Sequence, residues 1–171
     1  MLHLHEIETG AVVFIDANIF VYHFSKDSVF KDSCTKFLLR VENAEIHGVA
    51  SAAVVMEAAH RLMMVEASAA IDVEIKNLLR YLKQHPEEVK KLTQHLIVPE
   101  KIEELNISIE PVTNALIKQS QNNKTKYGLL SNDALSIKIM ESLGISLLAS
   151  NDTDFKSVDW VTICTPVSKT S

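Results

Sequence analysis

Four acidic residues, each at the edge of an apolar segment, carry the clearest chemistry in this sequence. They are Asp16 in VVFIDANIF, Glu57 in AAVVMEAA, Asp133 in LLSNDALSI and Asp152 in SLLASNDTDF. A carboxylate beside a buried segment is costly to desolvate unless something compensates its charge. Several such carboxylates together indicate that they share a cation.

The ligand chemistry of these signatures favours Mg²⁺ or Mn²⁺ over Zn²⁺, because it offers hard oxygen atoms and neither histidine nor cysteine. The seven histidines are scattered and show no HExxH spacing. His60 follows Glu57 by three residues, and we interpret it as an ordinary, partly buried histidine. The chain has no Gly-rich phosphate loop and no GxSxG motif, which excludes nucleotide-dependent motors and serine hydrolases.

Two of the acids are expected to meet at one edge of a sheet. Asp16 follows the apolar run 11–15, and Asp152 follows the run 145–150; both runs read as buried strands. Ligand sites in open parallel sheets lie outside the carboxyl ends of the strands. We therefore expect both side chains to emerge on the same rim.

The other two acids are expected on helices. Asp133 lies in the first turn of its helix, where the helix dipole favours an anion. Glu57 lies about two turns into its helix, after Val54, Val55 and Met56, and this run predicts a helix that is mostly buried around a carboxylate facing a polar cleft.

Each acid taken alone also has a structural interpretation. Asp133 could be a plain N-terminal charge, and Asp16 and Asp152 could cap the segments that follow their strands. Glu57 could pair with Arg61, four residues further on. The interpretation as one site depends on all four acids occurring together.

The order of the expected elements predicts an α/β domain with a largely parallel sheet. Strands are expected at 11–15, 46–50, 107–112, 145–150 and 160–165. Helices are expected from residue 17, at 27–42, at 52–65 after a Ser51 cap, at 113–123 and at 131–144. The middle, 66–105, is expected to form two helices separated by Pro86, and NNKTKYG (122–128) a polar loop.

The length of 171 residues, 47% of them hydrophobic and 23% charged, fits one domain over 1–165 with a C-terminal tail at 166–171. No apolar run reaches about 18 residues, so no membrane contact is expected. The first residues lack the features of a secretory signal, and we expect a cytoplasmic protein with Cys34 and Cys164 reduced.

The net charge of −5 differs from the basic footprint of a general nucleic-acid binder. Two divalent cations in an acidic cluster would bring it to about −1. Nucleic-acid binding should therefore depend on metal and on local basic residues such as Arg61, Lys124, Lys126 and Lys138. A solvated surface is the alternative for each of these side chains.

The motifs resemble the PIN domain, a family of metal-dependent ribonucleases, and most closely its VapC-type toxin branch. The resemblance runs from about Val12 to Cys164. It is carried by the opening apolar–Asp–x–Asn (Ile15, Asp16, Asn18), by Glu57 after a Ser-led turn, and by SNDALSIKIM and ASNDTDF. It implies a three-layer α/β/α domain with a mostly parallel central sheet.

The resemblance also implies roles for individual residues. Asp16, Glu57, Asp133 and Asp152 would be the catalytic acids and would bind one or two Mg²⁺ or Mn²⁺ ions. Asp154 would be an outer ligand of the metal or only a cap for the turn into Phe155. The remaining implied positions are the polar residues Asn18 and Ser150, which flank the metals.

The implied activity is an endoribonuclease that hydrolyses RNA by a metal-activated water, as the toxin of a toxin–antitoxin pair. The alternatives are an RNA-processing nuclease without an antitoxin and a PIN-like binding module that has lost catalysis. Two departures bear on substrate and partner: the helical middle is longer than in the smallest toxins, and no segment clearly suits an antitoxin.

A homodimer is expected from the resemblance and from a surplus of apolar residues between 52 and 82. These residues are Val54, Val55, Leu62, Met63, Met64, Val65, Leu78, Leu79 and Leu82.

Overall fold

The computed structural model describes residues 2–168, and a six-stranded sheet in which every pairing is parallel lies at its centre. The strand order is β1-β6-β5-β2-β3-β4. The strands are β1 (Leu2–His3), β2 (Val12–Ile15), β3 (His47–Ser51), β4 (Ser108–Glu110), β5 (Leu147–Ala149) and β6 (Thr162–Thr165). The predicted α/β class with a parallel sheet is confirmed. The edge strand β1 was not expected, because two residues carry no recognisable pattern.

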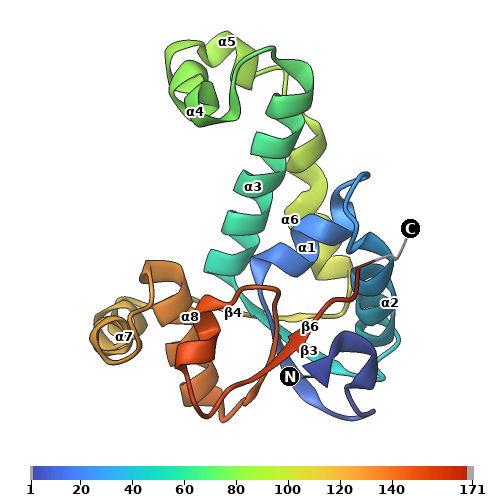
Figure 1. Cartoon of the computed structure of the whole chain (residues 1–171), viewed down its shortest axis with the longest axis vertical. Coiled ribbons are helices and arrows are strands. Elements are labelled where there is room, and N and C mark those ends of the chain that lie inside the picture. Colours follow the sequence, from blue (N-terminus) through green and yellow to red (C-terminus); the bar gives the residue numbers. More distant parts are fainter. Residues whose placement is uncertain (1, 169–171) are drawn as a thin grey trace.

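Helices cover both faces of this sheet and give three layers (Figure 1). They are α1 (Ala17–Phe24), α2 (Lys31–Glu42), α3 (Ala52–Ala70), α4 (Ile75–Gln84), α5 (Pro86–Val89), α6 (Val98–Glu104), α7 (Asn114–Tyr127) and α8 (Ser131–Leu143). The connections from β2 to β4 place α1, α2, the start of α3 and the end of α6 on one face, whereas α4 and α5 lie away from the sheet. The chain then returns to β5 through α7 and α8 on the opposite face. Short 3₁₀ helices are η1 (Leu4–Glu6), η2 (Gln94–Ile97) and η3 (Asp154–Ser157).

The central strand β2 shows why the apolar runs could be read as strands. Val13, Phe14 and Ile15 are fully buried, because β2 has a neighbour on each side and helices on both faces. A strand buried on both faces reads as a continuous apolar run rather than an alternating one. Its last residue, Ile15, pairs with Ala149 of β5, which brings the segments that follow the two strands together.

The middle of the chain forms an arm that projects from the sheet (Figure 1). The long helix α3 carries α4 and α5 at its far end, and α6 runs back beside it. A second, smaller core holds the arm together and consists of Ala67, Leu78, Leu82 and Leu92. The helix predicted before Pro86 is confirmed as α4, which begins at Ile75 and ends at Gln84.

The expected continuous helix after Pro86 is wrong. Helix α5 ends at Val89, and the separate 3₁₀ helix η2 follows before α6 begins at Val98. The cause is Glu66 of α3, whose carboxylate accepts hydrogen bonds from the backbone N–H groups of Thr93, Gln94 and His95. These donors cap η2 and are not available to a helix running on from α5.

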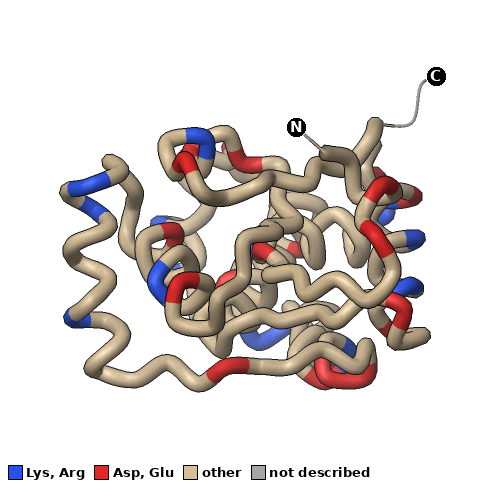
Figure 2. Tube along the Cα trace, turned by 90° about the horizontal axis from the view of Figure 1, so that it is seen from below, with Lys and Arg blue, Asp and Glu red and all other residues tan. Residues whose placement is uncertain are grey.

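The expected polar loop at 122–128 is also wrong, because α7 continues to Tyr127 and ends at Gly128. Gly128 has φ +74°, a left-handed conformation that commonly terminates helices. Asn123 is buried and donates to the carbonyl oxygen of Ala134, which fixes the last turns of α7 against α8. Figure 2 shows α7 as the helix at the left, with basic residues and no acidic residue along it.

The predicted reduced cysteines agree with the structure, where Cys34 and Cys164 are buried and unpaired within residues 2–168. No helix in the described part of the chain is long and apolar enough to cross a membrane. Of the expected tail, residues 169–171 lie outside the described residues, and the backbone N–H of Val167 donates to Ser33.

Candidate active site

All of the acids singled out in the sequence line one pocket of about 350 Å³ at the carboxyl edge of the sheet. Its lining consists of Asp16, Glu57, Arg61, Leu130, Ser131, Asn132, Asp133, Asp152 and Asp154. Four separate segments contribute to it: the start of α1, the first half of α3, the start of α8 and the turn after β5. A larger hollow of about 680 Å³ lies beside α2, but Asp32 is the one carboxylate among its lining residues.

Asp16 is the most firmly held of the acids. It caps α1, and its carboxylate accepts hydrogen bonds from the backbone N–H of Ala17 (2.7 Å) and from the side chains of Asn18 and Ser150. Burial raises the pKa of Asp16 from 3.8 to about 6, against the lowering effect of the Ser150 and Ala17 hydrogen bonds. Asp16 therefore both caps α1 and lines the acidic pocket.

Asn18 and Ser150 connect β2 and β5 at this edge. The side-chain nitrogen of Asn18 donates to Ser150 Oγ (3.0 Å), and its oxygen accepts from the backbone N–H of Asn151 (3.3 Å). Both residues are buried, so these contacts fix the turn that follows β5. Asn18 and Ser150, which the resemblance implied as flanking the metals, both lie beside Asp16, and their role toward a metal stays a prediction.

Asp152 and Asp154 lie in the turn between β5 and η3. The backbone N–H of Asp152 donates to Ser150 Oγ (3.0 Å), and the Asp152 carboxylate accepts from the backbone N–H of Asp154 (2.9 Å). Asp154 is exposed at the pocket rim and begins η3. Asp152 thus combines a capping contact with a place in the pocket.

Asp133 is the acid on which the charges of the other four carboxylates act. It lies in the first turn of α8, and its pKa is raised from 3.8 to about 6. Burial is the largest cause, followed by the negative charges of Asp16, Asp152, Glu57 and Asp154 in that order. Like charges at short range disfavour ionisation, so the pocket is a cluster of mutually repelling groups.

Glu57 reaches the pocket from α3 and has two partners. Its carboxylate lies 3.6 Å from Nε of Arg61 and accepts a hydrogen bond from the side chain of Asn132 (2.8 Å). The Arg61 pair and the pocket position, set out above as alternatives, are both present. The expectation of a helix mostly buried around Glu57 is wrong, because Met56 is 72% exposed and α3 buries only the stripe that includes Val54 and Ala58.

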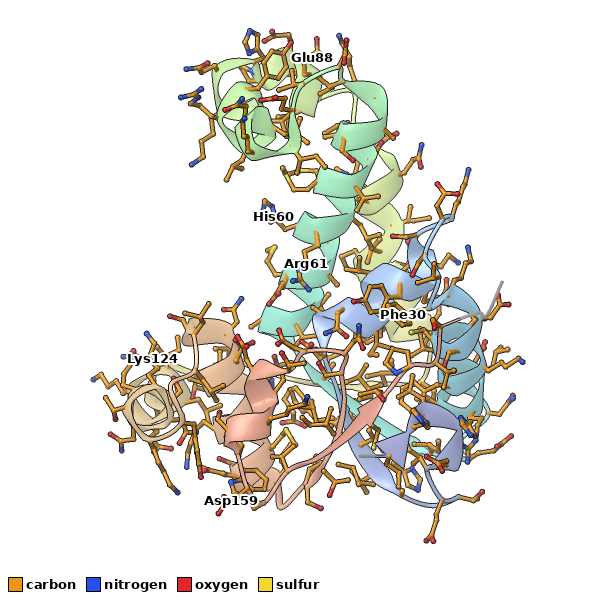
Figure 3. The ribbon with its side chains drawn as sticks, viewed as in Figure 1. Phe30, His60, Arg61, Glu88, Lys124 and Asp159 are labelled. Atoms are coloured by element: carbon orange, nitrogen blue, oxygen red, sulfur yellow. The ribbon has the colours of Figure 1, made fainter. Side chains whose placement is uncertain are left out.

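Asn132 is the residue that sequence reasoning missed, since an amide beside Asp133 carries no pattern of its own. The hydrogen bond from Asn132 joins α8 to α3 across the pocket. His60 was expected to be partly buried, but it is exposed on α3 and is not among the residues that line the pocket (Figure 3). Of the basic residues, Arg61 lines the pocket, Lys138 pairs with Glu141, and Lys124 and Lys126 lie on α7.

The pocket suits a hard divalent cation in its donor set, which consists of carboxylate, amide and hydroxyl oxygens. The raised pKa values of Asp16 and Asp133 are what a cluster shows before a cation compensates it. Within residues 2–168, no three acidic, histidine or cysteine side chains are already arranged tightly enough to hold an ion.

The comparisons with known proteins agree with this architecture. A model of the PIN domain family matches residues 13–161. This chain belongs to the PIN domain family. Ribonuclease VapC2 of Methanocaldococcus jannaschii is 31% identical to it over 156 residues, which cover 88% of this chain and 91% of that protein. The resemblance to the family seen in the sequence is thus confirmed.

Two solved structures share the fold. VapC20 of Mycobacterium tuberculosis, a toxin that cleaves the sarcin-ricin loop, superposes with a TM-score of 0.59 at 15% identity, over 87% of this chain and 96% of that one. VapBC2 of Rickettsia felis, solved bound to a DNA fragment from its promoter, gives a TM-score of 0.52 at 16% identity, over 91% and 99%. The three-layer PIN-like fold is therefore confirmed.

Proposed function

We propose that this PIN-domain protein is a metal-dependent endoribonuclease and the toxin of a toxin–antitoxin pair, acting in the cytoplasm. The observation that supports it most is the convergence of Asp16, Glu57, Asp133 and Asp152 on one pocket. The relative of 31% identity is a ribonuclease, and one structural neighbour is a toxin that cleaves RNA.

In this proposal the four acids hold one or two Mg²⁺ or Mn²⁺ ions, and Asp154 lies outside them at the rim. The bound cation would supply an activated water and would offset the charge of the phosphate. The expected products carry 5′-phosphate and 3′-hydroxyl ends.

The side chains around the acids would keep this site in shape. Asn18 and Ser150 fix the direction of the Asp16 carboxylate, which one hydrogen bond alone would leave free to rotate. Asn132 and Arg61 hold Glu57 at the opposite wall. Asp133 sits at the N-terminus of α8, where free N–H groups and the helix dipole favour negative charge. Arg61 would also face the RNA phosphate that enters the pocket.

The direct test is digestion of total RNA by the purified protein with Mg²⁺ or Mn²⁺, with and without EDTA, followed by mapping of the cut ends. We expect cleavage that EDTA abolishes and that Asp133→Asn lacks. Asp159→Asn is the matched control, because Asp159 is an exposed aspartate that does not line the pocket (Figure 3). If the RNA stays intact with either metal, the nuclease proposal is rejected and the remaining interpretation is a PIN-like binding module without catalysis.

The proposed partners are an antitoxin protein and a second copy of the chain. The antitoxin rests on the likeness to VapBC2, and a small reading frame beside the gene whose product blocks cleavage would support it. The homodimer rests on exposed apolar side chains. Some of the apolar residues between 52 and 82 are buried, including Val54, Leu62 and Leu78, whereas Val65 and Leu79 are nearly half exposed.

A further inference from the structure

Helix α7 stands in the longest part of the chain without negative charge. Residues 111–132 contain no aspartate or glutamate, although the chain as a whole has a net charge of −5. The same stretch carries Lys118, Lys124 and Lys126, all on α7. This local positive charge runs against the composition of the rest of the protein.

The charges of these lysines are not neutralised by ion pairs among the described residues. Four lysines elsewhere do lie beside carboxylates: Lys76 with Glu74 (3.0 Å), Lys91 with Glu88 (2.7 Å), Lys101 with Glu104 (2.6 Å) and Lys138 with Glu141 (3.3 Å). On α7, Lys124 donates to the neutral side chain of Gln121, and Lys126 lies 4.6 Å from the centre of the Tyr127 ring. The negative charges of Asp159 and Glu141 also act on Lys126, but neither forms an ion pair with it.

The rest of α7 is open to solvent. The helix buries only Ser120 and Asn123, with Leu116 and Tyr127 partly buried on the same face. The remaining surface is lysine, glutamine, asparagine and threonine, with Ile117 as its one exposed large apolar side chain. A protein partner usually needs an apolar centre to its interface, which this face lacks.

The end of α7 leads directly to the acidic pocket. Only Gly128 and Leu129 separate α7 from Leu130, which lines the pocket and is 72% exposed. The two helices pack on each other, so the last turn of α7 lies beside the first turn of α8, which contains Asp133. From Lys118 to Lys126 the helix rises about 12 Å.

We propose that the lysine-bearing surface of α7 binds the phosphate backbone of RNA next to the segment that enters the acidic pocket. The inference rests on the proposed function and adds the surface on which the substrate docks. A pocket of carboxylates repels phosphates, so attraction must come from cations outside it. At 3.6 residues per turn, the exposed Lys118 and Lys126 lie on one side of α7 and the half-buried Lys124 lies on another. These lysines supply that attraction, and the neighbouring amides can donate hydrogen bonds to phosphate oxygens.

The test compares two triple variants with the same change in net charge. Lys118→Gln/Lys124→Gln/Lys126→Gln removes the charge of α7, and Lys76→Gln/Arg80→Gln/Lys83→Gln removes three exposed charges from α4 on the arm. Binding of a fluorescent RNA hairpin is measured by anisotropy over about 50 to 200 mM KCl, in EDTA and again with Ca²⁺ to compensate the charge of the pocket. Melting temperatures confirm folding, and Lys118→Gln alone serves as a milder variant.

The expected result is a loss of salt dependence specific to α7. Each phosphate contact on a single strand contributes about 0.7 to the slope of log affinity against log salt, so the α7 variant should lose about 2 and Lys118→Gln about 0.7. Affinity near 100 mM KCl should fall at least about tenfold. The α4 variant should bind as the wild type does. Unchanged binding by the α7 variant, or an equal loss in the α4 variant, would overturn the inference.

Cleavage assays separate this inference from the proposed function. If wild-type protein cuts no RNA with Mn²⁺ but shows the α7-dependent slope, the nuclease proposal fails and the docking surface stands. If wild type cleaves the hairpin and the α7 variant does so with unchanged KM, the docking surface fails and the nuclease stands. If the α7 variant keeps its RNA binding but loses binding to an acidic protein, α7 docks a protein instead of RNA, and the inference is overturned.

Discussion

Replacing Asp133 by asparagine should stabilise the metal-free protein while abolishing its proposed activity. Asp133→Asn keeps the size of the side chain and removes the charge that four other carboxylates oppose. Asp133 also makes a cleaner probe than Asp16, because the Asp16 carboxylate accepts three hydrogen bonds that an amide would partly lose. Destabilisation from lost contacts should therefore be small at Asp133.

The magnitude follows from the rise of the Asp133 pKa from 3.8 to about 6. A rise of this size corresponds to roughly 3 kcal/mol of unfavourable interaction when the group is fully charged. Because the side chain is partly exposed and its neighbours can move apart, we expect a gain of about 1 to 2 kcal/mol for the variant. In a domain of this length that raises Tm by roughly 3 to 6 °C.

The sign of the pH dependence can be worked out from the same shift. Between pH 4 and 6 the folded wild type binds more protons at Asp133 than the unfolded chain does, so its stability falls as pH rises through this window. Asp133→Asn lacks this dependence. The gain in Tm should therefore be largest above about pH 7 and should vanish near about pH 4.

The assay is thermal melting in EDTA across this pH range, with Asp159→Asn as the control for removing one surface charge. The reasoning is refuted if Asp133→Asn melts at or below wild type at pH 8, or if the difference does not shrink as the pH falls. Full RNA cleavage by the variant at equal metal would separately refute its assignment as a metal ligand.

Three further predictions concern the same site and the assembly. Millimolar Mn²⁺ should stabilise wild type by about 2.7 kcal/mol at a hundredfold excess over Kd and should stabilise Asp133→Asn much less; equal shifts in both would place the ion elsewhere. Glu57→Gln should keep the hydrogen bond from Asn132, cost at most about 0.5 kcal/mol through loss of the Arg61 pair, and lower cleavage by orders of magnitude; an unchanged rate would make Glu57 structural. Light scattering should give about 38 kDa, twice the 19.1 kDa of one chain, and a monomer mass at micromolar concentration would reject the dimer.

The sheet and the convergence of the acids could be predicted because they follow from burial. The strands β2 and β5 are apolar along their whole length, and each is followed at once by a polar residue. In a parallel sheet these two facts are enough to bring Asp16 and Asp152 to the same edge. The metal-ligand roles of the acids stay predictions, since the geometry shows only that they share a pocket.

The errors arose where tertiary contacts override local pattern. The last turns of α7 are too polar to predict a helix, and they form because Asn123 is buried against α8 and Gly128 provides the terminal turn. The helix expected after Pro86 does not continue because the Glu66 carboxylate, on α3, accepts hydrogen bonds from the backbone N–H groups of residues 93–95. The nearest of these residues is 27 positions from Glu66 in the sequence. Neither contact leaves a periodic signal.

The distribution of charge places the basic helix α7 next to the acidic pocket. The polar segment first read as a loop is the helix that carries the unpaired lysines, and the acidic pocket lies immediately beyond its end. A repelling carboxylate cluster lowers the stability of the metal-free fold, and a bound cation would compensate it. In the two proposals together, the cation would bind where the carboxylates converge, and the phosphates of the RNA would be held by the lysines of α7 beside the pocket. Capping contacts alone do not require the acids to line one pocket, whereas a shared cation does.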